Sequence, residues 1–226
     1  MELSEKSLAV LKNFATINPN IVINEGNVVK TISEAKNVLA SATLDVNFPK
    51  SFGIYDLNEF LSVLSLIETP VLSFTNDNYV LISENLSLKS QIKYHYSDIS
   101  MLTVPTKDIT MPECEVSFAL TRDVLSRVKR AASVLGHGEM SLSVTDGALE
   151  LRVIDQNDPT SNVYSILVDG TFTDPNFNFV FNISNLKMID ADYRVDISSK
   201  LISHFVNETS SLDYWVALEK TSKYGE

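Results

Sequence analysis

The sequence TRDVLSRVKRAASVL, at residues 121–135, combines an apolar stripe with a concentration of positive charge. Its apolar residues recur every three or four positions, which predicts an amphipathic helix that begins after Thr121 and ends near Gly136. The opposite face carries four basic residues: Arg122, Arg127, Lys129 and Arg130. Because the whole chain has a net charge of -11, such a helix would attract a polyanion that the remaining surface repels. We expect a nucleic-acid partner, with an ordinary solvated helix face as the alternative.

The order of elements around this helix recurs along the chain. After it, residues 140–144 and 148–154 predict two strands joined by the turn Thr145-Asp146-Gly147. The same order of helix, strand, turn and strand is predicted at residues 4–32. Two more helices are predicted, at residues 57–67 after Asp56 and at residues 183–189 after Asn182, and strands follow each. Four units of one helix with strands are therefore expected.

This repetition predicts two similar domains, residues 1–105 and 106–226, each built from two such units. The expected class is α+β, with antiparallel sheets. The join lies in residues 99–113, where Pro105 and Pro112 interrupt strand pairing. Five residues make this segment unusually apolar: Met101, Leu102, Val104, Ile109 and Met111. They either cover a sheet edge or form one wall of a groove for a partner.

Length and composition indicate a globular protein. The 226 residues are 44% apolar, and no stretch approaches the roughly 20 apolar residues that span a bilayer. The first residues, MELSEKSLAV, lack the features of a signal peptide, and Cys114 is the only cysteine. We expect a soluble, intracellular protein without a membrane partner.

Four segments, in the same order along nearly the whole chain, resemble the sliding clamps of T-even-type bacteriophages, which are DNA polymerase processivity factors. They are LKNFATIN at 11–18, IYDLNEFLSVLSL at 54–66, FNFVFNISNLKMI at 177–189 and YWVALE at 214–219. The resemblance implies the DNA clamp fold, in which antiparallel sheets lie outside and helices line a ring of three subunits. Two strand-like segments, residues 91–96 and 161–167, are the expected edges that join subunits of this homotrimer.

The resemblance also implies where DNA and partner proteins bind. Four basic residues match lumen positions of the family: Lys12, Arg127, Arg130 and Lys187. Helical geometry adds three more: Lys6, Arg122 and Lys129. A charge-poor second helix and the acidic Asp190 and Asp192 depart from a uniformly positive lumen. The expected partner groove is lined by six residues: Leu102, Val104, Ile109, Tyr214, Trp215 and Val216. A core position is the alternative for Trp215.

The partners implied by the resemblance are double-stranded DNA, read without sequence specificity, the replicative DNA polymerase, an ATP-driven clamp loader and late-transcription factors. The expected location is the cytoplasm of the infected bacterial host. No cofactor and no catalysis are expected, because the chain lacks a glycine-rich phosphate loop. His95, His137 and His204 lack metal-ligand spacing, and the acidic residues near 155–158 and 190–192 are typical of solvated loops. The remaining alternatives are an oligomeric phage structural protein and a metal-dependent nuclease.

Overall fold

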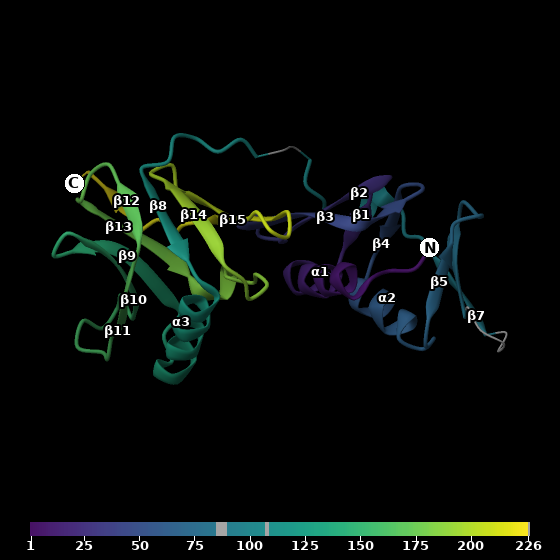
Figure 1. The fold of residues 1–226 in the computed structure, drawn as a ribbon, viewed down its shortest axis with the longest axis horizontal. Helices are drawn as coiled ribbons and strands as arrows, with labels where there is room; N and C mark the ends of the chain where they lie inside the picture. The colour runs from purple at the N-terminus through teal and green to yellow at the C-terminus, as the bar shows by residue number, and fades with distance from the viewer. Residues whose placement is uncertain (85–89, 107–108, 226) are drawn as a thin grey trace. The chain divides into compact units, whose positions relative to one another are not determined.

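The computed structural model describes residues 1–84, 90–106 and 109–225, and the chain separates into two compact units, Met1–Lys107 and Asp108–Glu226 (Figure 1). The predicted boundary lies between residues 105 and 106. Residues 99–113, in which the join was expected, are called the joining segment below, and its residues 107 and 108 lie outside the described residues. Both units combine antiparallel sheets with helices, and the described residues form three α-helices. None of these helices is both long and apolar enough to cross a membrane.

The first unit contains two α-helices and two groups of paired strands. The helices are α1 (Glu5–Ile17) and α2 (Leu57–Leu64), and they pack against each other. One group pairs in the order β3-β2-β1-β4, with bounds β1 (Ile21–Ile23), β2 (Gly26–Ile32), β3 (Val38–Phe48) and β4 (Phe52–Ile54). The other is the sheet β5-β6-β7, with bounds β5 (Pro70–Ser73), β6 (Tyr79–Glu84) and β7 (Gln91–His95). A 3₁₀ turn, η1 (Ile99–Met101), follows.

Side-chain caps set the starts of both helices in this unit. The Ser4 side chain accepts a hydrogen bond from the Ser7 backbone N–H at 3.0 Å, so α1 begins one residue after its N-cap. The Asp56 carboxylate accepts bonds from the second and third residues of α2, as its position before the apolar run predicts. Phe14 of α1 and Phe60 of α2 are buried in the core of this unit. Burial of these faces stabilises short helices that would be marginal alone.

The second unit contains α3 (Arg122–Leu135) and two groups of paired strands. One group pairs in the order β12-β8-β14-β15-β16, with bounds β8 (Val116–Leu120), β12 (Gly170–Phe172), β14 (Tyr193–Ser198), β15 (Ile202–Asn207) and β16 (Leu212–Ala217). The other is the sheet β11-β10-β9-β13-β17, with bounds β9 (Glu139–Thr145), β10 (Ala148–Ile154), β11 (Tyr164–Val168), β13 (Phe177–Asn182) and β17 (Lys223–Tyr224).

Helix α3 and the hairpin after it confirm the local predictions. The Thr121 hydroxyl accepts a hydrogen bond from the Val124 N–H, and Gly136 ends the helix in the left-handed region at φ 73°. Leu125, Val128 and Ala132 of the apolar stripe are buried, its other members are half-buried, and α3 packs on β10 and β11. Asp146 and Gly147 both have positive φ, 50° and 80°, which is the geometry of a tight two-residue hairpin between β9 and β10.

The prediction of a fourth helix, at residues 183–189, is wrong. Only one turn of 3₁₀-helix, η2 (Ile183–Asn185), follows Asn182, whose side chain accepts a hydrogen bond from the Ser184 N–H at 3.0 Å. Leu186 leaves helical geometry at ψ 52°, yet its side chain and that of Met188 are buried. The segment therefore contributes to the core without being helical.

Tyrosine side chains explain why this segment does not continue as a helix. The Ile189 N–H donates to the Tyr214 hydroxyl at 3.2 Å, and the Ile189 carbonyl accepts from the Tyr193 hydroxyl at 2.6 Å. Backbone groups that are satisfied by side chains from β14 and β16 do not require helical partners. Asn182 is thus a correctly predicted cap, but the structure that it begins is only one turn long.

Candidate nucleic-acid interface

Helix α3 carries four basic residues. Three of them are arginines: Arg122, Arg127 and Arg130. The Arg127 Nε lies 2.7 Å from the Asp123 carboxylate one turn earlier on the same helix. At the start of α3, the Arg122 backbone N–H donates to the Asp192 carboxylate at 2.6 Å, so a second acid adjoins the helix. Both carboxylates reduce the positive potential that α3 can present to a polyanion.

Lys129, the fourth basic residue of α3, is held by the segment that follows η2. Its Nζ lies 3.0 Å from the Asp190 carboxylate and 3.3 Å from the Met188 carbonyl oxygen. Its side chain is 31% exposed. These contacts tie the ammonium group to its own unit, so Lys129 is less available to a phosphate than the arginines of α3.

The basic residues of the first unit lie on α1. Lys6 and Lys12 are exposed, and Lys12 borders a shallow groove of about 310 Å³ between α1 and α2. The α2 side of that groove consists of Asn58, Leu61, Ser62 and Ser65. None of the residues that line this groove is a carboxylate, so they do not oppose the charge of Lys12. Lys187 is exposed too, but it lies after η2 rather than on a helix.

The six predicted partner-groove residues are not all on the surface. Tyr214 and Val216 are 0% exposed and Leu102 is 8% exposed, so these three side chains belong to the cores of their units. Val104, Ile109 and Trp215 are half-buried. Strand β16 buries Leu212, Tyr214 and Val216 on one face, which leaves Trp215 on the other.

Trp215 lies on a polar face of its sheet rather than in the core. Its ring stacks on that of His204, with centroids 4.5 Å apart and planes 7° apart. The His204 Nε2 lies 2.9 Å from the Asp213 carboxylate. Trp215 is thus positioned by a neighbouring strand and remains partly open to solvent.

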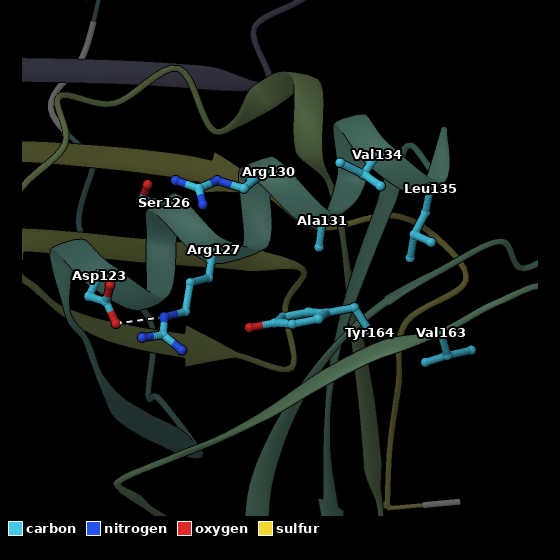
Figure 2. Close-up of a pocket in the computed structure, with 9 residues that line it drawn as sticks. All are labelled: Asp123, Ser126, Arg127, Arg130, Ala131, Val134, Leu135, Val163 and Tyr164. Carbon is cyan, nitrogen blue, oxygen red and sulfur yellow. Dashed lines mark ion pairs between the residues drawn. The ribbon is translucent and has the colours of Figure 1, made fainter.

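Sequence reasoning missed a groove of about 560 Å³ that is bounded by α3 and β11 (Figure 2). Figure 2 shows Tyr164 of β11 beneath α3, with Arg127, Ala131 and Val134 along the helix. Val134 is 78% exposed and Val163 is 44% exposed. The available signal was Val134 itself, because it falls outside the apolar stripe of the helix.

Strands β7 and β11 each lie at one end of their sheet. Neither pairs on its outer side with any described residue. The side chains of β7, and those of β11 up to Leu167, alternate between half-buried and exposed, and Leu167 is 62% exposed. An open edge of this kind is a template for a further strand.

The acidic residues were also candidates for a metal site. In residues 1–84, 90–106 and 109–225, no group of three His, Cys, Asp or Glu side chains could hold a metal ion. Near residues 155–158, Asp155 and Asp158 instead accept backbone bonds from residues two positions later, each at 2.9 Å. These are turn contacts, as expected of solvated loops.

Comparison with known proteins gives consistent matches over nearly the whole chain. Residues 4–100 match the family described as DNA polymerase processivity factor, and residues 117–220 match the family described as gp45 sliding clamp, C terminal. The sliding clamp of Vibrio phage KVP40 is 30% identical over 97% of this chain and 99% of that protein. The sliding clamp of Escherichia phage RB69 is 27% identical over 99% of both. Among solved structures, PCNA from Thermococcus kodakaraensis has a TM-score of 0.70 at 15% identity, covering 96% of this chain and 98% of that chain.

Proposed function

Because the chain belongs to the sliding-clamp family of phage DNA polymerase processivity factors, we propose that three copies close into a ring around duplex DNA and tether the replicative polymerase. The observation that carries this proposal is the presence of accessible basic side chains on α1 and α3 in a chain of net charge -11. A clamp must hold DNA without stopping on it, so topology and weak phosphate contacts suit the task better than base readout.

We propose five DNA-facing cations. Four lie outside the α3–β11 groove and one, Arg130, lies at its border: Lys6, Lys12, Arg122, Lys187 and Arg130. Each would contact phosphates weakly, and three copies would multiply the contacts around the duplex. Lys129 would contribute little, since Asp190 and the Met188 carbonyl already hold its ammonium group. The acidic remainder of the surface would discourage binding of DNA outside the ring.

The open edges of β7 and β11 support ring closure. One edge belongs to the first unit and the other to the second, so pairing β7 of one copy with β11 of the next is a head-to-tail contact. Repeated head-to-tail contacts close into a ring when the rotation between copies permits it. The TM-score of 0.70 to a PCNA supports the fold that such a ring needs.

Partner proteins are proposed to bind the joining segment. Ile99 and Met101 are 44% and 75% exposed, and exposed apolar side chains that gather on one segment suit a contact site. With Val104 and Ile109 of the same segment, they are our candidates for binding apolar peptides of the polymerase and of late-transcription factors, and Trp215 on β16 is a separate candidate. An ATP-driven loader would open and close the ring, in the cytoplasm of the infected bacterial host.

Retention on closed and open DNA tests the proposal. The protein would be loaded onto nicked circular duplex DNA with its loader and ATP, and the DNA would then be cut once. Retention on the circle and rapid release after cutting are expected, because the link is topological. Equal retention on both forms would overturn encirclement, and cleavage of the circle with Mg²⁺ alone would indicate a nuclease. Sedimentation equilibrium should give the mass of three 25.1 kDa chains.

A further inference from the structure

The α3–β11 groove has walls of two kinds. One part is basic, from Arg127 with Arg130 at the border, and another is apolar, from the exposed Val134 and Val163. Phosphates gain nothing from contact with valine side chains, whereas a protein surface buries them favourably. The groove also adjoins the open edge of β11, to which Tyr164 belongs. These features suit a protein partner better than DNA.

The first unit offers a surface of the opposite charge beside its own open edge. Residues 56–69, which contain α2, include three acids, Asp56, Glu59 and Glu68, and no lysine or arginine. Glu59 is exposed, and the next residue, Phe60, packs edge-on against Tyr94 of β7 with centroids 5.0 Å apart. Burial first, and then the carboxylates of Glu59 and Asp56, raises the pKa of the Tyr94 hydroxyl to about 12. The Tyr94 hydroxyl also donates to the Asp56 carbonyl oxygen at 3.4 Å, so the first turn of α2, which contains Glu59, lies against the edge strand β7.

The two edges match when β7 of one copy is placed beside β11 of another. Ile92 and Tyr94 are the half-buried positions of β7, and Tyr164 and Ile166 are those of β11. Residues directly opposite each other on antiparallel strands share a face, so pairing must bring these positions together. Of the registers that place half-buried positions opposite each other, the two with the most overlap put Tyr94 either directly opposite Tyr164 or diagonal to it.

This matching brings a helix from each copy to the same side of the joined sheet. Tyr94 lies against the first turn of α2, which contains Glu59, and Tyr164 lies under α3 next to Arg127 (Figure 2). We propose that Glu59 of one copy pairs with Arg127 of the next, beside a Tyr94–Tyr164 contact, and that Arg127 acts in the joint between subunits rather than in DNA binding. This inference rests on the proposed ring.

The existing ion pair of Arg127 is compatible with this role. Its Nε is engaged by Asp123 at 2.7 Å, and a guanidinium has further N–H groups for a second carboxylate. Asp123 would thus orient Arg127 toward the joint. The arrangement also explains why α2 carries no cation although the chain belongs to a family whose members are sliding clamps. Glu59, the acidic residue within α2, is needed against the neighbouring α3.

Charge reversal with reciprocal rescue tests the joint. Arg127→Glu and Glu59→Arg should each raise the dissociation constant of the trimer at least tenfold in sedimentation measurements. The double variant should return it to within about threefold of the parent. If a reversed variant folds poorly, Arg127→Gln and Glu59→Gln give a double-mutant cycle, in which the double variant should weaken the trimer by less than the sum of the two single effects. Failure of the double variant to recover would overturn the Glu59–Arg127 pair.

A control variant separates this inference from the proposed ring. Lys12→Glu changes a cation on α1, outside both edge strands and outside α2 and α3, and should shorten retention on circular DNA while the trimer remains intact. If Arg127→Glu behaves like Lys12→Glu, with an intact trimer and shorter retention, Arg127 binds DNA and our inference is wrong, although the ring stands. A parent protein that sediments only as a monomer at tens of micromolar would overturn the ring and the joint together.

Discussion

The ammonium group of Lys129 lies 3.0 Å from the carboxylate of Asp190 and 3.3 Å from the carbonyl oxygen of Met188. This one interaction accounts for two differences from the sequence-based expectations. It gives the Met188 carbonyl, in a segment that was expected to be helical, a hydrogen-bond partner outside a helix. It also holds the Lys129 ammonium group, which was expected to face DNA, within the protein. The charge of α3 is therefore partly used within the second unit.

Neutralising Lys129 and Lys12 should have different consequences. Lys12→Gln removes an exposed cation from each subunit, and the slope of log affinity against log salt should fall by about 0.9 for each phosphate that is no longer neutralised. Lys129→Gln should leave that slope unchanged but lower the free energy of unfolding by about 1 kcal/mol, since it breaks a half-exposed ion pair and a hydrogen bond. Retention on nicked circles at several salt concentrations and urea denaturation measure the two effects. Equal salt slopes for both variants would contradict this assignment.

The sequence predicted those parts of the fold that depend on neighbouring residues. The Thr121 and Gly136 ends of α3 and the Asp146-Gly147 turn are local, and each was predicted correctly. The DNA clamp fold was likewise predicted, and the matches to sliding clamps and to PCNA confirm it. Hydrophobic periodicity and turn residues carry enough information for the local features, and the resemblance of four collinear segments supplied the fold.

Features that depend on distant residues were not predictable. The segment after Asn182 has helix-like spacing, but hydroxyl groups of Tyr193 and Tyr214 take its backbone bonds. In β16 both faces carry large side chains, so spacing alone could not decide that Tyr214 is buried and Trp215 is not. The groove beside α3 required knowledge of which strand, β11, lies under that helix.

The start of α1 should be sensitive to acid. The Asp45 carboxylate accepts hydrogen bonds from the hydroxyls of Ser7 and Ser4, and these bonds lower its pKa below the ordinary 3.8. A lowered folded-state pKa stabilises the fold above pH 3.8, and this contribution is lost as the pH falls through the folded-state pKa. Asp45→Asn should therefore be less stable than the parent near neutral pH, and the difference should shrink in strong acid. Thermal melting between about pH 2 and 7 measures it, and a constant difference across that range would contradict the expectation.

A glycine is required at position 53 because residues 97–102 approach its backbone closely. A Cβ at this position would lie 2.6 Å from the Ser97 carbonyl oxygen and 2.8 Å from the Leu102 side chain. Gly53→Ala should therefore displace residues 97–102 and destabilise the protein by about 2 kcal/mol. The matched control is Gly138→Ala, because a Cβ there meets nothing within 4 Å. Urea denaturation of both variants is the measurement, and similar destabilisation of both would show that the approach at Gly53 is not limiting.

Trp215 should report the binding of polymerase peptides without any label. It is the only tryptophan, it is half-buried, and its ring stacks on His204, so a ligand that covers or displaces this stack changes its emission. Titration with a synthetic peptide of the polymerase's C-terminal residues should shift the emission in a saturable way. Val104→Asp and Ile109→Asp place carboxylates on half-buried apolar positions and should each weaken binding about fivefold to tenfold.

The control for this titration is Val28→Asp, which adds the same charge at an apolar residue of β2 that is 42% exposed. It should leave the affinity within about twofold of the parent, because Val28 lies outside the joining segment. Sedimentation must show that all three variants have the same mass as the parent, since a change of assembly would lower the apparent affinity for another reason. If Val104→Asp and Ile109→Asp bind the peptide as tightly as Val28→Asp, the peptide docks elsewhere, and the exposed Ile99 and Met101 would be the next positions to change.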